Sequence, residues 1–168
     1  MPIEEINIVV PCSNRKTVDP PPAHRLRDVP GDTIAERCKN WLDRIKNPES
    51  DLLPADDLYC GEHWSVCREL PDIAQENGWQ ASLWVCSTGY GLIPADAEIA
   101  PYAATFSRGH EDSLHAGMNS EESAEESVRH WWSNLSDWAG PGPSRPRSLT
   151  ELAKRNPKTP LLIVASKA

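Results

Sequence analysis

The sequence predicts an α/β protein in which a mainly parallel, buried sheet is flanked by helices. Three short apolar runs, residues 6–10, 81–86 and 161–165, are typical of strands that are buried on both faces. Segments whose apolar residues recur at helical spacing lie between these runs. The chain has 168 residues and no internal repeat, so we expect a single domain over residues 1–168 with a core that needs no disulfides.

A proline-rich loop follows the first strand, and a helix is predicted after it over residues 33–46. Thr33 and Glu36 have the spacing of a capping box at the start of this helix, and Asp32 is an alternative cap. The helix should end before Pro48, which cannot continue it.

Three further helices are predicted along the rest of the chain. The first covers residues 62–77, where Pro71 is expected to kink or split the helix and Gly78 to close it. The last covers residues 149–155, after a stretch rich in proline and glycine. Between them, residues 120–138 have apolar side chains at helical spacing, namely Val128, Trp131, Trp132, Leu135 and Trp138.

The net charge of −8 is distributed unevenly along the chain. Residues 1–47 carry a net charge of +1, residues 48–126 carry −14, and residues 127–168 carry +5. An acidic protein repels nucleic acid in general, but basic ends that lie together in the fold would offer a local positive face. A solvated acidic surface with an incidental basic tail is the alternative interpretation.

The cysteines and the apolar segments indicate a cellular compartment. The five cysteines are odd in number and scattered, and no signal peptide or long apolar span accompanies them. We therefore expect a reduced, cytoplasmic protein that does not associate with a membrane.

Small and polar residues follow each predicted strand. Cys12 and Ser13 follow the first, Ser87 and Thr88 the second, and Ser166 the third. Carboxyl ends of parallel neighbouring strands meet at one edge of a sheet, so these residues are predicted to build one pocket. Other residues expected to bind a ligand at this edge, or to make it positive, are Asn14, Arg15, Lys16 and Lys167.

Several separated motifs resemble the YaaA superfamily. They are Pro-Cys-Ser-Asn-Arg-Lys-Thr at 11–17, Leu-Tyr-Cys-Gly-Glu-His-Trp at 58–64, Cys-Ser-Thr-Gly-Tyr-Gly-Leu-Ile-Pro at 86–94, Ile-Ala-Pro-Tyr at 99–102 and Val-Ala-Ser at 164–166. Their order and approximate spacing agree over most of the chain. The peroxide-stress members of this superfamily are associated with DNA binding, so the resemblance implies a nucleic-acid partner and a role in stress response or DNA modification.

The opening motif also resembles the lysine-bearing motif of archaeosine synthase. The shared positions are Pro11, Cys12, Ser13, Lys16 and His24. In that family the lysine is the amine that joins a nitrile-bearing deazaguanine base. The resemblance therefore implies Lys16 as a catalytic amine, with Cys12 and His24 as the accompanying catalytic candidates.

Two physical roles are open for Lys16. A lysine is a nucleophile only when it is neutral, which requires that burial or a neighbouring cation such as Arg15 lowers its pKa. A charged Lys16 would instead hold an anion together with backbone N–H groups of residues 12–14. We favour the anion-holding or base-binding role. The chain has neither a Walker-type glycine loop nor a G-x-G-x-x-G motif, so no cofactor is predicted.

Two tyrosines are candidates for contact with a base. Tyr90 lies between Gly89 and Gly91 directly after the second strand, so its ring is free to turn over the pocket and stack on a ligand. Tyr102 follows Pro101, which stiffens its approach. The alternative for Tyr90 is a purely structural role at the edge of the sheet.

Metal binding and proteolysis are weaker alternatives. Cys60, His63 and Cys67 have a C-x2-H-x3-C spacing, and His110 and His115 in a loop could help to complete four ligands. Paired C-x2-C motifs are lacking, so no metal site is predicted. Cys12 and His24 are close in sequence but have no recognisable partner that would complete a protease site.

Two classes of function therefore remain. The first is a module that binds nucleic acid or a nucleobase at a positive pocket at the strand ends. The second is an enzyme of modified (deaza)purine metabolism that uses Lys16 as a covalent nucleophile or as an acid or base. Absence of binding to any of these ligands would leave a partner-protein role.

Overall fold

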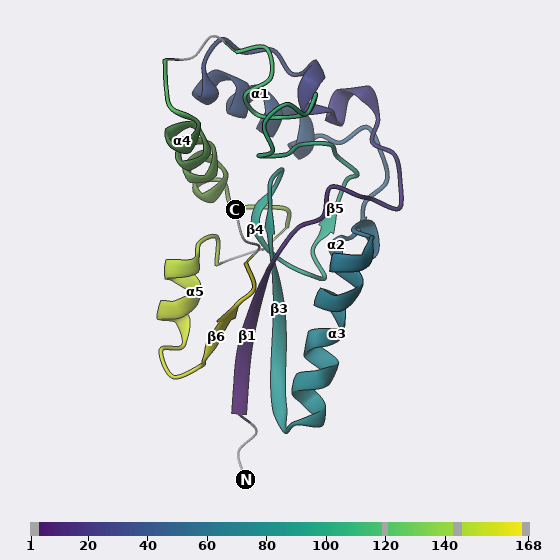
Figure 1. Cartoon of the computed structure of the whole chain (residues 1–168), viewed down its shortest axis with the longest axis vertical. Helices are drawn as coiled ribbons and strands as arrows, with labels where there is room; N and C mark the ends of the chain where they lie inside the picture. The colour runs from purple at the N-terminus through teal and green to yellow at the C-terminus, as the bar shows by residue number, and fades with distance from the viewer. Residues whose placement is uncertain (1–3, 119–120, 143–145, 166–168) are drawn as a thin grey trace.

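The computed structural model describes residues 4–118, 121–142 and 146–165, and its centre is a four-stranded mixed sheet (Figure 1). The sheet has the order β4-β3-β1-β6. Strand β1 (Glu4–Pro11) lies between β3 (Trp79–Ser87) and β6 (Leu161–Ile163) and is parallel to both. The prediction of three adjacent parallel strands is confirmed. The fourth strand, β4 (Gly91–Pro94), is antiparallel to β3 and was not expected.

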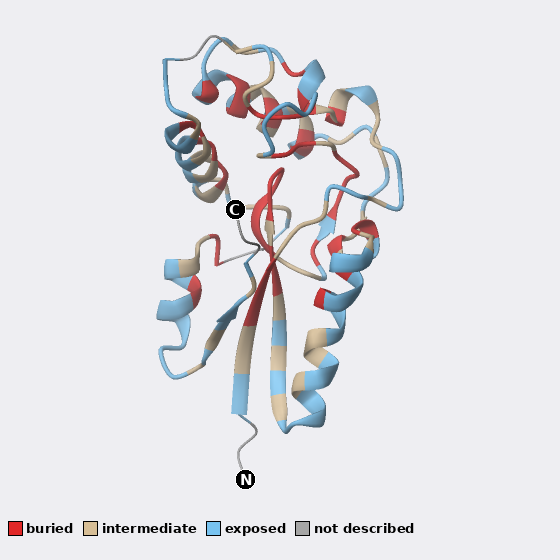
Figure 2. Ribbon diagram, in the orientation of Figure 1, coloured by how far each residue is buried: buried red, intermediate tan, exposed pale blue. Residues whose placement is uncertain are grey.

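The core is concentrated at the carboxyl halves of the central strands, as the burial colours in Figure 2 show. Along β1, Glu4 and Glu5 are exposed, whereas Val10 is fully buried. Side chains alternate between the two faces of a strand, so Ile8 packs in the main core cluster while Val9 packs with Leu152 on the other face. The carboxyl ends of β1 and β3, two of the three strand ends that were predicted to carry the site, are therefore the best-packed part of the sheet.

Strand β6 corrects the expectation that all three parallel strands are buried on both faces. Leu162 is 45% exposed and Ile163 is 52% exposed, although these neighbours point to opposite faces. The physical reason is the position of β6 at the edge of the sheet, where β1 is its single neighbour. An apolar run therefore indicated a strand here but not its burial.

Two helices pack together over the carboxyl end of the sheet. Helix α1 (Ile34–Lys46) is capped by Thr33, whose side chain accepts a hydrogen bond from the Glu36 N–H. Helix α4 (Ala124–Asp137) is capped by Ser123 in a capping box, later than the predicted start. The expected first residue, Ser120, lies outside the described residues.

The remaining predicted helices are also present. Helix α3 (Glu62–Glu76) packs on β3 and runs through Pro71 without a break, so the expected split is wrong. Burial of Trp64 and Cys67 on one face holds the helix in place despite the backbone hydrogen bond that a proline cannot donate. Helix α5 (Leu149–Arg155) begins and ends at the predicted residues.

Short elements complete the structure. Strands β2 (Leu53–Pro54) and β5 (Glu98–Ile99) form a two-stranded antiparallel sheet, and α2 (Ala55–Leu58) follows β2 directly. Two 3-10 helices, η1 (Pro22–His24) and η2 (Leu26–Asp28), lie in the proline-rich loop. Among the described helices, none combines the length and the apolar character that a membrane span requires.

Candidate functional site

The loop that follows β1 is fastened to two other segments of the chain. The Cys12 N–H donates to the Cys86 carbonyl at 3.2 Å, which extends the pairing of β1 with β3. The Ser13 hydroxyl donates to the Cys60 carbonyl at 2.7 Å, and the Cys60 N–H donates to the Arg15 carbonyl at 3.0 Å. The loop is therefore held between the end of β3 and the segment that precedes α3.

Lys16 lies at the centre of this arrangement. Its ammonium nitrogen is 4.4 Å from the centroid of the Tyr102 ring and 5.6 Å from that of Tyr59. It also donates a hydrogen bond of 3.3 Å to the Asn14 carbonyl. Within the described part of the chain, no carboxylate forms an ion pair with Lys16. An amine carries three hydrogen-bond donors, so Lys16 has donors left for a ligand.

Burial changes the proton affinity of Lys16. Desolvation lowers the pKa of its ammonium group below the ordinary value for lysine, and the nearby Cys12, Asp112 and Cys60 oppose this shift in part. A larger fraction of the side chain is therefore neutral at a given pH than for a solvated lysine. The electron-rich faces of two tyrosines stabilise the cationic form and act in the opposite direction.

Three hydroxyl groups form a closed ring of hydrogen bonds beneath Lys16. The Tyr59 hydroxyl donates to Ser87 Oγ at 3.0 Å, and the Tyr90 N–H donates to the same oxygen at 3.1 Å. Both acceptor positions of Ser87 are then used, so Ser87 donates to the Tyr102 hydroxyl at 2.8 Å, which in turn donates to Tyr59 at 2.9 Å. This ring fixes the two aromatic side chains that Lys16 contacts.

The two phenols in this ring are not acids or bases at neutral pH. Burial raises the pKa of both Tyr59 and Tyr102 well above the ordinary value for tyrosine. Ser87 and Tyr102 therefore belong to the floor of the site, where they support Lys16 through the hydroxyl ring.

The prediction that the Tyr90 ring stacks on a ligand is wrong in this structure. Tyr90 is 1% exposed and packs in the core. Its hydroxyl donates to the Ala100 carbonyl at 3.2 Å and accepts from the Ala100 N–H at 3.1 Å. Its ring lies against Tyr102 and Trp138, which gives Tyr90 the structural role that was left open as its alternative.

His24 is also structural. It is fully buried, its Nδ1 lies 3.1 Å from the Pro101 carbonyl, and its Nε2 accepts a hydrogen bond of 3.4 Å from the Glu49 N–H. Burial lowers the pKa of the imidazole, which agrees with a neutral ring that donates through Nδ1. Both nitrogens therefore serve backbone groups, and neither is free for the catalytic role for which the lysine motif made His24 a candidate.

The other predicted site residues fall into three groups. Cys12 lies beside Lys16, and its sulfur is 3.6 Å from the Thr88 hydroxyl. Asn14 and Arg15 are exposed at the rim of the site. Ser166 and Lys167 lie outside the described residues.

The described residues do not form the zinc site that was considered as an alternative. The His63 Nε2 and the Cys67 sulfur, one helical turn apart on α3, are 3.5 Å from each other. However, no three histidine, cysteine, aspartate or glutamate side chains gather as metal ligands anywhere in the described residues.

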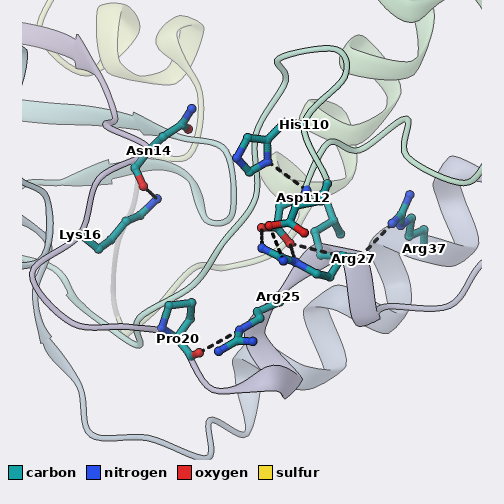
Figure 3. A network of polar contacts seen from close by, with 10 residues as sticks. Asn14, Lys16, Pro20, Arg25, Arg27, Arg37, His110 and Asp112 are labelled. Atoms are coloured by element: carbon teal, nitrogen blue, oxygen red, sulfur yellow. Dashed lines mark hydrogen bonds and ion pairs between the residues drawn. The ribbon is translucent and has the colours of Figure 1, made fainter.

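A polar cluster that the sequence did not reveal faces Lys16 across the site (Figure 3). Asp112 is buried and accepts hydrogen bonds from the backbone N–H and the guanidinium of Arg27. The Asp112 N–H donates to His110 Nδ1 at 3.0 Å. Burial alone would raise the pKa of the Asp112 carboxyl, but the hydrogen bonds and charge of Arg27 hold it below the ordinary value. Asp112 is therefore an anion within electrostatic reach of Lys16.

Comparison with family models, curated proteins and solved structures found no match to this chain. The resemblance to the YaaA superfamily and to the archaeosine synthase motif therefore stays a prediction. What the fold and the site define by themselves is an α/β protein with a partly buried lysine at the carboxyl ends of two parallel strands. Tyr59 lies within the motif at 58–64 but was given no role, although it contacts Lys16 in the structure.

Proposed function

We propose that the carboxyl ends of β1 and β3 bind a nucleobase or a nucleic acid, and that Lys16 makes the central contact. The observation that carries this proposal is the arrangement of the Lys16 amine, which lies over Tyr102 with the Asn14 carbonyl as its hydrogen-bond acceptor and no ion-pair partner in the described part of the chain. Acceptor atoms on base edges and phosphate oxygens both suit such a donor.

The rim of the site adds further groups for recognition. Asn14 and Arg15 are exposed beside Lys16, so an amide and a guanidinium are available to a ligand that reaches the ammonium group. The tyrosines below are held by their own hydroxyl ring and offer Lys16 a fixed support. The proposed contact is therefore one positioned amine rather than an extended basic surface.

The acidic remainder of the chain limits how nucleic acid would bind. Residues 48–126 carry a net charge of −14, and Arg147 in the basic final segment is buried with its guanidinium on backbone carbonyls. Arg147 is thus not available to a ligand, although it lies in the basic final segment. A local contact with a base or with one phosphate group agrees with this charge distribution better than a grip on a long duplex.

Replacement of Lys16 with alanine tests the proposal directly. We expect at least about a tenfold loss of affinity for the bases, nucleosides or short oligonucleotides that the parent binds, because a charge-assisted hydrogen bond disappears. Isothermal titration calorimetry measures this loss, and the melting temperature should change little because Lys16 has no buried ion pair to lose.

The matched control is Lys39→Ala, which removes an exposed lysine that pairs with Asp43 on α1. This variant should bind like the parent. Unchanged affinity in Lys16→Ala would contradict the proposal, and a large drop in its melting temperature would assign Lys16 a structural role.

One observation favours an enzyme as the second candidate. Burial lowers the Lys16 pKa, and a neutral amine is the form that attacks an electrophilic carbon. Addition to a nitrile forms one N–C bond and moves one amine proton to the nitrile nitrogen, so the adduct mass is the sum of the two reactants. Intact-mass spectrometry with purine and nitrile-bearing deazapurine bases should then show this adduct in the parent and not in Lys16→Arg.

A further inference from the structure

A cavity of about 600 Å³ lies beside the segment that carries Asp112. Its wall comes from residues 108–118 and from the first residues of α1 and α4. The polar side chains in this wall are Arg108, His110, Glu111, Ser113, His115, Glu122 and Ser127. The cavity is large enough for a sugar and a phosphate group, and the proposed function does not use it.

His110 belongs both to the wall of this cavity and to the polar cluster around Asp112. Its ring lines the cavity, and in Figure 3 it lies between Asp112 and the pair formed by Asn14 and Lys16. The Asp112 backbone N–H donates to His110 Nδ1, and the Asp112 carboxylate is within electrostatic reach of Lys16. Since Nδ1 accepts that hydrogen bond, a neutral His110 carries its proton on Nε2, where it is a donor.

The charged side chains in the cavity wall differ in whether they have partners. Both carboxylates have partners, since Glu111 forms an ion pair with Arg27, and Glu122 accepts from Ser127 at 3.4 Å and lies beside His130. The Arg108 guanidinium is exposed and forms no ion pair or side-chain hydrogen bond with the described residues. Its five donors therefore remain for an anion.

Two further groups make the Arg108 side of the cavity suitable for an anion. His115 is partly buried beside Arg108. Burial lowers the pKa of the His115 imidazole, and the positive charges of Arg108 and Arg37, both close to the ring, add to this shift. Arg37 is a second positive charge near His115. It is buried and donates hydrogen bonds to the Leu114 and Ala116 carbonyls.

We propose that the ligand of this site is a nucleoside monophosphate or a terminal nucleotide rather than a free base, with its base at Lys16 and its phosphate in the cavity against Arg108 and His110. This inference rests on the proposed function, and it adds the phosphate-binding half of the site. Arginine binds phosphate oxygens in a bidentate manner, and the His110 Nε2–H supplies a donor between the two halves.

The test compares nucleosides with their 5′-monophosphates. Isothermal titration calorimetry with the four common ribonucleosides and their monophosphates should show at least about a tenfold tighter binding of the monophosphate of the preferred base. Arg108→Ala should remove this advantage while nucleoside affinity stays the same. His110→Ala should weaken the monophosphate several-fold, and His110→Gln should restore part of the loss because its amide donates from a similar position.

The control is Arg129→Ala, which removes an exposed arginine that pairs with Glu125 on α4. It should leave the advantage of the monophosphate intact. Equal affinity for nucleosides and monophosphates, or an advantage that survives Arg108→Ala, would overturn the inference. Nucleoside binding that still depends on Lys16 would then leave the proposed function in place, whereas absence of all binding would overturn both.

Discussion

Replacement of Arg147 with alanine should lower the free energy of unfolding by about 3 to 5 kcal/mol. Arg147 is 1% exposed, and its guanidinium donates to four backbone carbonyls, those of Tyr90, Leu92, Leu135 and Trp138. Its loss would leave these buried acceptors without a partner. The arginine joins the last turn of α4 to the β3–β4 hairpin, so the effect should extend over both elements.

Denaturant unfolding followed by tryptophan fluorescence measures this loss. Arg147→Lys should recover only a small part of the stability, because one ammonium group cannot reach four carbonyls that surround a planar guanidinium. Arg155→Ala, at the exposed end of α5, is the matched control and should change the free energy of unfolding by less than about 0.5 kcal/mol. A loss below about 1 kcal/mol in Arg147→Ala would show that water replaces the guanidinium at these carbonyls.

The apolar pattern predicted where the strands and helices lie better than it predicted how far they are buried. Apolar runs located β1, β3 and β6, and a capping residue located the start of α1 to within a residue. The Pro/Gly-rich stretch preceded α5 as expected. The pattern did not distinguish the edge strand β6 from the central strand β1, since both are apolar and their exposure depends on how many strands lie beside them. Tertiary packing also keeps α3 continuous, because the burial of one face of this helix outweighs the effect of Pro71.

The turn after β3 was misread because its glycines suggested a ligand loop. Gly91 has a φ of +76° and lies where a Cβ would meet the Arg147 guanidinium at 3.0 Å. The glycine thus allows the close approach of a buried arginine from a segment 56 residues later in the sequence. The two glycines indicated an unusual backbone conformation at this turn. The sequence alone does not reveal that Arg147 is the partner that requires Gly91.

The site was predicted in part. The sequence placed Lys16, Cys12 and Ser87 at neighbouring strand ends, and the register of β1 with β3 places these segments together. The contributions of Tyr59 and Asp112 were missed because they depend on loops whose paths no periodicity describes. Long-range hydrogen bonds rather than local patterns decide which aromatic rings support Lys16.

Replacement of Trp41 with alanine should also destabilise the protein by about 3 to 5 kcal/mol. Trp41 on α1 is fully buried, and its indole N–H donates to the Gly89 carbonyl at 2.8 Å. Trp131 on α4 donates in the same way to the Thr88 carbonyl at 2.8 Å. The two tryptophans, from two different helices, therefore bind the turn that follows β3. Alanine at position 41 would remove one of these hydrogen bonds and leave a large cavity.

This substitution should also affect ligand binding, because the Trp41 ring packs edge-on against Tyr102 at 6.1 Å between centroids. Tyr102 is the ring nearest the Lys16 amine, so its loosening would displace the central contact of the proposed site. Trp41→Phe should keep most of this packing and lose about 1 to 3 kcal/mol, since it leaves the Gly89 carbonyl without a donor. Chemical unfolding and calorimetric titration of both variants measure the two effects.

Trp79→Ala, at the partly buried start of β3, is the control and should leave ligand affinity unchanged. Equal affinity in the parent and in Trp41→Ala below its melting temperature would show that Tyr102 keeps its place without this tryptophan, and would separate the support of the turn from the support of Lys16.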